Sequence, residues 1–528
     1  MQKKRIIVCD AIHQKGLDIL AENQDIDFID ASKEPKDKLL ELMGDYDVAI
    51  TRSSTDVDQK FIDAATNLKA VVRAGVGVDN VDIEGCSKDG IIVMNVPTAN
   101  TIAAVELTMA HMLSCARSFP NANNHLKYDR IWKREKWYGI ELKDKKLGVI
   151  GFGNIGSRVG KRALAFEMDV IAYDPYVNPS KATDVGAKYT KDFSDILECD
   201  FITIHTPKNS ETIDMIGAEE IAKMKDGVRL INCARGGLYN EDALYEGVKS
   251  GKIAYAGIDV FITEPAIDNK LLDLENISVT PHLGANTRES QQKIAEQAAE
   301  QAINAARGAS YPNALNLPFK ESDMPDSVKP YLELAQKIGY LAAQINVGYI
   351  KSLKIEAEGD ISEYLSSLTT FALVGSLKES LGEKINYVNA EFVAKEKSIE
   401  ITSEEVSNLS EYKNKIKIKL TTDNDTIMIG GTVFSDTIEK IVSIDDIKLD
   451  FKPKGKMVFF SNKDKPGVIA KISKIMSDEN INIADFRLGR DAHGEALAVV
   501  LTDEAVSKEV LNTLKSIEEC NWVSYASI

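Results

Sequence analysis

Short apolar runs alternate with longer amphipathic stretches along the chain from Arg5 to about Leu315. The runs typical of buried strands are RIIVCD, DVAIT, LKAVVRA, IIVMNV, KLGVIG, DVIAYD, FITIHT, VRLINCA, AYAGIDV and ISVTPH. Helical patterns separate most of them, which predicts parallel α/β units whose sheets are covered on both faces. Some ten strands are many for one twisted open sheet, so we expect two parallel sheets.

The pattern changes after Leu315. The segment NLPFKESDMPDSVKP combines prolines with charges and is typical of a linker. Beyond it, one helical stretch, YLELAQKIGYLAAQI, is followed by strands that alternate apolar and polar residues, namely GYIKSLKIEAEG, KIKIKLTT and TIMIGGTVF. Such alternation indicates half-exposed antiparallel strands and hence an α+β domain.

A further module begins near Lys454. Its pattern is strand, turn at Pro466 and Gly467, helix, strand, strand, helix, strand. This order predicts a ferredoxin-like βαββαβ fold at the C-terminal end of the sequence.

Charge and composition disfavour several classes of partner. The net charge of −17 argues against nucleic acid. No apolar run approaches the roughly 20 residues that cross a bilayer, so we expect no membrane partner. The N-terminal IIVCD is too short for the apolar region of an export signal. The six cysteines form no CxxC pair and the six histidines no HExxH motif, so we expect reduced thiols, a cytoplasmic location and no metal site.

One segment, KLGVIGFGNIGSRVGKRALAFEMDVIAYD, has the order strand, glycine turn, helix, strand. Within it, Gly151 permits a tight turn, Gly153 lets a pyrophosphate approach the backbone and Gly156 lets the helix pack on the strand. The start of the helix offers free N–H groups to phosphate. Asp174 ends the second strand, where its carboxylate binds ribose hydroxyls and repels a 2′-phosphate. The segment predicts a Rossmann-like domain that binds NAD rather than NADP.

A nicotinamide cofactor implies hydride transfer, for which the protein must also manage a proton. Three residues at the ends of predicted strands suit this chemistry: Arg235 in INCARGG, Glu264 in GIDVFITEP and His282 in ISVTPHLGAN. A histidine takes a hydroxyl proton, a carboxylate favours its protonated form, and an arginine grips a carboxylate with two hydrogen bonds. Each residue alone has a structural explanation, but their joint placement after the dinucleotide motif favours catalysis.

The motifs VVRAGVGVDNVD, VPTANTIAAVELTMAHML, GFGNIG, HTP, INCARGG, GIDVF and TPHLGA resemble the D-2-hydroxyacid dehydrogenase family and occur in its order. The C-terminal module resembles an ACT domain, and the region with VNAEFVAKEKSIEI and GGTVF resembles the intervening domain of the family's long form. The resemblance implies five segments: a substrate-binding domain (1–98), an NAD-binding Rossmann domain (99–283), a return to the substrate-binding domain (284–315), an intervening α+β domain (316–452) and an ACT regulatory domain (453–528).

The resemblance also implies roles for single residues. Arg235, Glu264 and His282 are expected to be catalytic. Contacts to NAD are expected from Gly151, Gly153, Asn154, Ile155, Gly156, Asp174, Thr206, Pro207, Cys233, Ala234, Asp259 and Gly284. One departure is Val76, where relatives often carry a threonine that contacts the cofactor; a hydroxyl contact is lost there.

The substrate implied by the resemblance is 3-phospho-D-glycerate, oxidised to 3-phosphohydroxypyruvate in the first step of L-serine biosynthesis. It carries a carboxylate and a phosphate, so Arg235 alone cannot bind both. Arg52 and Arg73 each follow a predicted strand, and the family pattern places substrate contacts at Arg52, Ser53, Arg73 and Asn100. These cations are expected to concentrate positive charge in a chain that is negative overall.

A basic cluster lies further along the sequence. We call it the arm cluster; it consists of Lys127, Arg130, Lys133, Arg134 and Lys136. It is either a solvated helix face or a cationic lid or dimer arm, from which Arg134 would reach a neighbouring subunit, since relatives dimerise through this part of the nucleotide domain. We expect self-association as a dimer or tetramer.

The ACT resemblance implies an effector site for L-serine between two paired C-terminal modules. Its expected contacts are Asn462, Asp464 and Asn482. Asp464 lies beside the turn at Pro466 and Gly467, whose N–H groups suit a carboxylate, and Asn482 follows the helix, from where it is expected to bridge the ligand and the neighbouring chain. Relatives often have histidine or tyrosine where this chain has Asn462, so the site is expected to be weaker or retuned. The alternative is an ACT fold kept only for dimerisation.

Two further interpretations of the whole chain stay open. One is another D-2-hydroxyacid dehydrogenase, acting on glycerate, lactate or glyoxylate-type substrates; the ACT-like module argues against it, because regulation suits a committed biosynthetic step. The other is a non-catalytic dinucleotide sensor on the same fold, which the set of Arg235, Glu264 and His282 disfavours.

Overall fold

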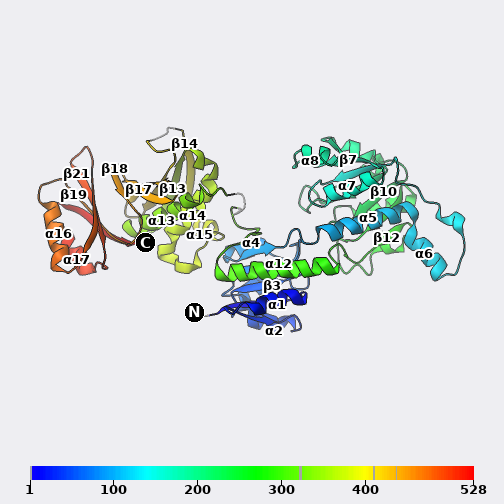
Figure 1. Ribbon diagram of the computed structural model, residues 1–528, viewed down its shortest axis with the longest axis horizontal. Coiled ribbons are helices and arrows are strands. Elements are labelled where there is room, and N and C mark those ends of the chain that lie inside the picture. Colours follow the sequence, from blue (N-terminus) through cyan, green and yellow to red (C-terminus); the bar gives the residue numbers. More distant parts are fainter. Residues whose placement is uncertain (1–2, 320–323, 408–410, 436) are drawn as a thin grey trace.

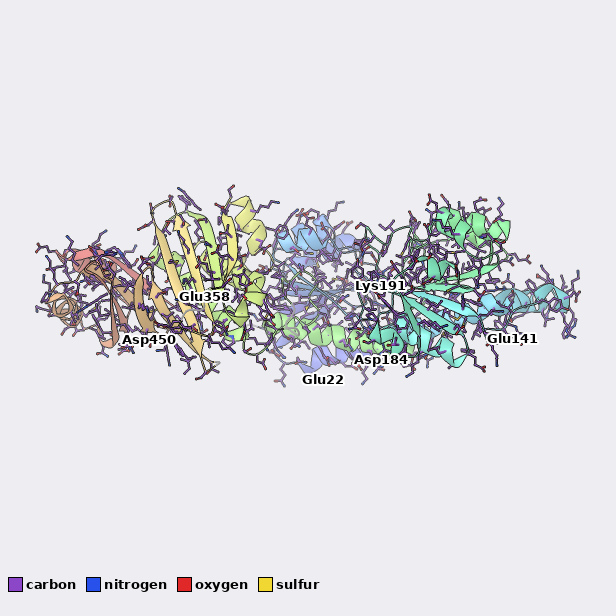
Figure 2. All side chains as sticks on the ribbon, turned by 90° about the horizontal axis from the view of Figure 1, so that it is seen from above. Glu22, Glu141, Asp184, Lys191, Glu358 and Asp450 are labelled. Carbon is purple, nitrogen blue, oxygen red and sulfur yellow. The ribbon has the colours of Figure 1, made fainter. Side chains whose placement is uncertain are left out.

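The computed structural model describes residues 3–319, 324–407, 411–435 and 437–528. Four units follow one another along its longest axis: a first parallel-sheet unit lies between a second, larger one and the two C-terminal units (Figure 1). From above, Glu358 and Asp450 lie in the third unit, toward one end of this row, and Glu141 lies toward the other (Figure 2). The predicted fold class, two parallel-sheet domains followed by α+β and ferredoxin-like units, is confirmed. Residues 320–323 of the predicted linker lie outside the described residues.

The first sheet has five parallel strands in the order β2-β1-β3-β4-β5. Its strands are β1 (Lys4–Val8), β2 (Ile26–Asp30), β3 (Val48–Thr51), β4 (Ala70–Arg73) and β5 (Ile92–Asn95), with helices α1 (Gln14–Glu22), α2 (Lys36–Met43), α3 (Gln59–Ala64) and α4 (Ile83–Lys88). Strand β2 was not predicted, because its sequence IDFID interrupts the apolar run with two aspartates. Helix α12 (Arg288–Arg307) returns from the second unit and packs Ile294, Ala298 and Ala302 on this sheet.

The second sheet has seven parallel strands in the order β12-β11-β10-β9-β6-β7-β8. These are β6 (Lys146–Ile150), β7 (Asp169–Tyr173), β8 (Lys188–Thr190), β9 (Phe201–Ile204), β10 (Val228–Asn232), β11 (Ile253–Ile258) and β12 (Ile277–Val279). The helices are α5 (Thr101–Arg117), α6 (Phe119–Lys127), α7 (Gly156–Ala165), α8 (Ser180–Thr183), α9 (Ser194–Leu197), α10 (Ala218–Lys223) and α11 (Glu241–Ser250). Strand β8, an edge strand of three residues, was not predicted either.

The third unit packs helices on one mixed sheet. Its helices are α13 (Lys329–Ile345), α14 (Leu365–Leu381) and α15 (Ala390–Glu396), and its strands are β13 (Ile350–Glu358), β14 (Glu400–Val406), β15 (Lys415–Thr422), β16 (Thr426–Phe434), β17 (Ile438–Ile444) and β18 (Ile447–Phe451). The predicted antiparallel pairing holds for β15 with β16. The edge strand β14 instead pairs parallel with β13.

The last unit follows the predicted βαββαβ order. Its elements are β19 (Lys456–Lys463), α16 (Val468–Asp478), β20 (Ile483–Arg490), β21 (Glu495–Thr502), α17 (Lys508–Lys515) and β22 (Cys520–Ser527), with sheet order β20-β21-β19-β22. The six cysteines are free thiols and five of them are buried. Within the described residues, every helix is too short or too polar to traverse a lipid bilayer.

Candidate active site

The glycine turn joins β6 to α7 in a geometry that only glycine permits. Gly151 has φ +83°, and a Cβ there would lie 2.7 Å from the carbonyl oxygen of His205. A Cβ at Gly156 would lie 2.0 Å from the carbonyl oxygen of Gly151, so strand and helix touch backbone to backbone. A Cβ at Gly153 would meet nothing within 4 Å. At Gly151 and Gly156 the turn is packed against protein atoms, whereas the space beside Gly153 is free. A pyrophosphate requires such a free space next to the backbone.

Asp174 follows β7 and lies against this turn. Its carboxylate is almost fully buried and accepts hydrogen bonds from the backbone N–H groups of Phe152, at 2.8 Å, and Tyr176, at 2.9 Å. These bonds fix the carboxylate beside the glycine turn, where the ribose of a dinucleotide would lie. The residues present therefore fit NAD.

A cavity of about 380 Å³ opens at the carboxyl ends of the parallel strands. It collects predicted residues from several loops and helix starts: Asn100, Asn154, Ile155, Thr206, Pro207, Cys233, Ala234, Arg235, His282 and Gly284. Val76, the departure from the family pattern, also lines it. Ligands bind at this edge in open α/β sheets, because several loops converge there.

His282 and Glu264 form an ion pair at this cavity. The Nδ1 atom of His282 lies 2.8 Å from Oε2 of Glu264, whose Oε1 accepts the N–H of Phe261 at 3.0 Å. The hydrogen bond that His282 donates to Glu264 raises the pKa of His282 above its ordinary value, and burial opposes this only in part. Burial also pushes the pKa of Glu264 upward, but the bonds from His282 and Phe261 outweigh it and hold that pKa low. The pair is a base whose proton is stabilised by a fixed carboxylate.

Asp259 is fully buried and supports the turn that carries His282. Its carboxylate accepts the N–H groups of Leu283, at 2.7 Å, and Gly284, at 2.9 Å, and the hydroxyl of Thr280, at 2.6 Å. Burial raises the pKa of Asp259, although these bonds oppose the effect. The contact of Asp259 with the cofactor stays a prediction. Its hydrogen bonds to the turn that carries His282 were not predicted from the sequence.

The three predicted arginines lie within electrostatic range of one another. Burial, followed by the charges of Arg52 and Arg235, lowers the pKa of Arg73 to about 10, so it stays charged at neutral pH. Its Nε is buried and has no hydrogen-bond partner in the described part of the chain. Three guanidinium groups that feel one another's charge, one of them with an unpaired buried Nε, indicate a site for an anion.

Two of these arginines are bonded to acceptor groups on other elements. Those acceptors were not identified from the sequence. Arg52 donates to the carbonyl of Ala11 at 3.0 Å and to Oε1 of Gln291 at 2.8 Å. Arg235 pairs through Nε with Asp79 at 3.3 Å. Ser53 lines an adjoining cavity of about 560 Å³ together with Glu264 and His282.

None of the five described residues of the arm cluster lines the cavity at His282. Lys136 instead pairs with Glu275 and lines a separate cavity of about 490 Å³ beside α6 and the short helix η1 (Arg134–Trp137). Arg134 is exposed, and its predicted contact with a neighbouring subunit stays a prediction.

A cavity of about 310 Å³ in the last unit contains two of the three predicted effector residues. Asn462 and Asp464 line it beside Gly467, whereas Asn482 lies past the far end of α16 and donates to Asp503 at 2.6 Å. Asp464 pairs with Nε of Arg490 at 3.2 Å, a partner that the sequence did not single out. Oδ1 of Asn462 is buried and has no partner in the described residues.

Comparisons with known proteins agree with this organisation. A family model described as D-isomer specific 2-hydroxyacid dehydrogenase, NAD binding domain, matches residues 109–284. The D-3-phosphoglycerate dehydrogenase intervening domain matches residues 327–445, and the ACT domain matches residues 456–519. The resemblances noted in the sequence are therefore confirmed.

Similar proteins extend over nearly the whole chain. A D-3-phosphoglycerate dehydrogenase of Bacillus subtilis is 38% identical over 98% of this chain and 98% of its own. One of Methanocaldococcus jannaschii is 38% identical over 97% of this chain and 98% of its own. Among solved structures, a D-lactate dehydrogenase of Aquifex aeolicus complexed with NAD and lactic acid is 27% identical, with a TM-score of 0.52 over 59% of this chain and 99% of that chain.

Proposed function

The chain belongs to the D-3-phosphoglycerate dehydrogenase family, and we propose that it oxidises 3-phospho-D-glycerate to 3-phosphohydroxypyruvate with NAD, the first step of L-serine biosynthesis. The observation that carries the proposal is the His282–Glu264 pair, 2.8 Å apart, beside a cavity that Arg235 also lines. A base and an anion-binding cation therefore face the same space.

The chain's own residues divide the chemistry among them. When bound, NAD supplies the acceptor for the hydride that leaves C2 of the substrate. Neutral His282 takes the proton of the C2 hydroxyl through Nε2, while Nδ1 stays on Glu264, which stabilises the imidazolium that forms. Arg235 binds the substrate carboxylate and polarises the developing carbonyl.

Arg52 and Arg73 are the cations left for the phosphate. Arg73 is mostly buried with its Nε unsatisfied, so an anion there replaces a missing hydrogen-bond partner. Arg52 is held in place by Ala11 and Gln291. Ser53 and Asn100 add short polar groups beside the cleft, and the buried Oδ1 of Asn100 also lacks a partner in the described residues.

The test is a comparison of substrates with NAD. We expect turnover with 3-phosphoglycerate to exceed turnover with glycerate and lactate, and glyoxylate reduction to be slow. His282→Ala should lower kcat by on the order of 10²–10⁴, the usual range for loss of a general base, with little change in NAD affinity. Equal activity on glycerate would favour a different 2-hydroxyacid dehydrogenase, and NAD binding without turnover would favour the sensor.

The phosphate assignment has its own variants. Arg52→Ala and Arg73→Ala should each raise KM for 3-phosphoglycerate by roughly 10–150-fold, because a hydrogen bond to a charged group is lost, and should affect glycerate much less. Arg487→Ala, a change in the last unit where Arg487 pairs with Asp485, is the control. Equal losses for both substrates would move the phosphate site elsewhere.

L-Serine is the effector that the ACT unit suggests. We infer that it binds at Asn462 and Asp464 in an interface between two C-terminal units and slows turnover by restricting domain closure. Because Asp464 already pairs with Arg490, the ammonium group of serine must compete with that guanidinium. Calorimetry with wild type and Asp464→Ala tests this, and no binding to wild type at millimolar serine would refute it.

Self-association is supported by exposed aromatic side chains around the arm cluster. Phe119 is 68% exposed, Tyr128 67%, Trp132 77% and Tyr138 86%, which is unusual for side chains of this size on a surface that stays in water. We expect sedimentation velocity to give a dimer or tetramer for wild type, and a smaller species for Trp132→Glu. A monomeric wild type would contradict the proposal.

A further inference from the structure

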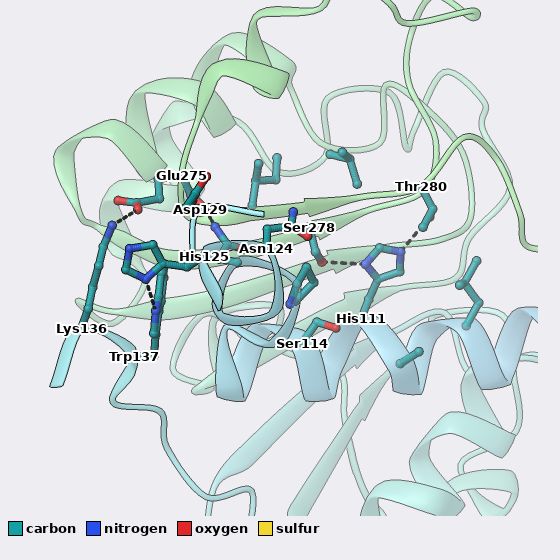
Figure 3. Close-up of a pocket in the computed structure, with 16 residues that line it drawn as sticks. His111, Ser114, Asn124, His125, Asp129, Lys136, Trp137, Glu275, Ser278 and Thr280 are labelled. Atoms are coloured by element: carbon teal, nitrogen blue, oxygen red, sulfur yellow. Dashed lines mark hydrogen bonds and ion pairs between the residues drawn. The ribbon is translucent and has the colours of Figure 1, made fainter. Parts of the chain in front are cut away.

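One buried histidine outside the catalytic set connects to the catalytic turn. His111 lies in α5, is 4% exposed, and lines the inner end of the 490 Å³ cavity beside the arm cluster. Its Nδ1 lies 2.8 Å from the hydroxyl of Ser278 and its Nε2 lies 2.9 Å from the hydroxyl of Thr280. Figure 3 shows the ring between these two hydroxyls, which β12 and the residue just after it present to α5.

The hydrogen-bond directions along this chain of groups follow from proton counting. The Thr280 hydroxyl gives its single proton to Oδ1 of Asp259, at 2.6 Å. It can then only accept from His111, so Nε2 carries the ring proton and Nδ1 accepts the hydroxyl proton of Ser278. This tautomer is neutral, in agreement with burial, which lowers the pKa of His111 to about 4.

The chain of groups ends at the catalytic turn. Asp259 holds the N–H groups of Leu283 and Gly284 through its carboxylate, and its backbone carbonyl accepts the N–H of His282 at 2.9 Å. His282 has φ +55°, a left-handed conformation that a non-glycine residue keeps only when its surroundings impose it. The bonds from Asp259 supply that constraint.

We propose that His111 and Thr280 are positioning residues for His282, and that they act by orienting the carboxylate of Asp259 beneath the catalytic turn. The proposal deepens the proposed function and rests on it for the catalytic readout. Without the hydroxyl of Thr280, the carboxylate keeps its two backbone donors but loses the one bond that ties it to α5. Because the carboxylate is then less firmly oriented, the turn from His282 to Gly284 shifts, and His282 moves away from Glu264.

The test uses Thr280→Val, which removes the hydroxyl at nearly constant volume, and His111→Leu. In the full-length chain at saturating NAD, we expect each to lower kcat by on the order of 10–100-fold, because small displacements of a catalytic group are costly, with KM for 3-phosphoglycerate changed less than threefold. Thr280→Ser should restore most of kcat. The control Ser114→Ala, one turn further along α5 on the same cavity, should leave kcat at the wild-type value.

A second readout needs no substrate. Histidine-selective NMR of the NAD-bound chain, with His282→Ala to assign the resonance, reports the pKa of His282, which Glu264, Asp259 and Arg235 surround. We expect this pKa to fall in Thr280→Val and His111→Leu as the bond to Glu264 weakens, and to recover in Thr280→Ser.

The outcomes separate the two proposals. An unchanged His282 titration and unchanged kcat in Thr280→Val would overturn the positioning role, as would a Thr280→Ser variant no better than Thr280→Val. An inactive wild type with the expected NMR shifts would overturn the proposed function and support the positioning role.

Discussion

At the scale of single residues, the chemistry depends on how the protein distributes protons. Glu264 keeps His282 oriented and favours its charged form, while the hydrogen bonds that Glu264 accepts from Phe261 and His282 keep that carboxylate ionised. Oxidation needs the neutral imidazole of His282. The bond to Glu264 stabilises the imidazolium that proton transfer forms, and for the same reason a higher pH is needed before His282 is neutral.

Glu264→Gln makes that balance measurable. Loss of the carboxylate removes the main cause of the raised pKa of His282 and leaves burial, which lowers it. The acid limb of kcat/KM for oxidation should therefore move to lower pH, while kcat at high pH falls moderately. A pH–rate profile measured beside Glu275→Gln, a carboxylate paired with Lys136, checks this. A limb that moves to higher pH would contradict the role given to Glu264.

The role proposed for Asp174, the choice between NAD and NADP, also belongs to the scale of single residues. Asp174→Ser removes the repulsion of a 2′-phosphate and a charged acceptor for ribose, so the ratio of kcat/KM for NADP to that for NAD should rise by roughly 10–150-fold. Asp169→Ser, at the exposed start of the same strand, is the control. Wild-type enzyme that prefers NADP would refute this interpretation of Asp174.

At the scale of elements, the site depends on how closely strands and helices approach. The turn between β6 and α7 has two kinds of glycine: Gly156 lies against backbone, and Gly153 faces open space. Gly156 allows the helix to pack on the strand, and Gly153 is expected to leave room for the cofactor; the motif alone does not distinguish these roles. Helix α12 likewise joins the units, since it begins just after the catalytic turn and packs on the first sheet.

Substitution by alanine should separate the two glycines. Gly156→Ala forces a methyl group to 2.0 Å from the carbonyl of Gly151, so we expect a loss of about 1–3 kcal/mol and a clear drop in Tm. Gly153→Ala meets no protein atom and should leave Tm unchanged, but should weaken NAD by about tenfold or more, because the methyl group occupies the phosphate space. Thermal melts and NAD titrations distinguish them, and a shared loss of stability would contradict the assignment.

At the scale of the whole molecule, the two C-terminal units share one apolar core. The sheet of the last unit places Met457, Phe459 and Leu497 in the same cluster as α13, while α16 and α17 cover its opposite face. Ser524 donates to the carbonyl of Ile345 at 3.1 Å at the same contact. On the other side, Asn386 of the third unit donates to the carbonyl of Gly90 at 2.7 Å. The last unit is thus connected to the first unit through the third.

Two neighbouring phenylalanines test that shared core. Phe459 belongs to the core shared with α13 and contacts Phe451 of β18, Phe460 belongs to the core with α16 and α17, and both are fully buried. Each change to alanine should cost about 3–5 kcal/mol. In hydrogen exchange, Phe459→Ala should deprotect α13 together with the last unit, whereas Phe460→Ala should deprotect the last unit alone. An α13 that keeps its protection in Phe459→Ala would show that the units are energetically separate.

The sequence by itself determined the parallel α/β order, the dinucleotide motif and the placement of Arg235, Glu264 and His282 at strand ends. These are local properties: apolar periodicity reports which face of an element is buried, and the carboxyl ends of parallel strands necessarily meet at one edge. The edge strands β2 and β8 were not predicted, because a polar or very short strand shows little apolar periodicity.

Only the tertiary structure decided which distant groups meet. Arg235 pairs with Asp79, Asp464 with Arg490, and Asn482 with Asp503, and His111 donates to Thr280. In each case the sequence around one residue gives no sign of its partner. Periodicity specifies the direction in which a side chain points relative to its own element. Which residue it contacts there depends on how the elements pack against one another. That packing is decided by the burial of apolar surface over the whole chain.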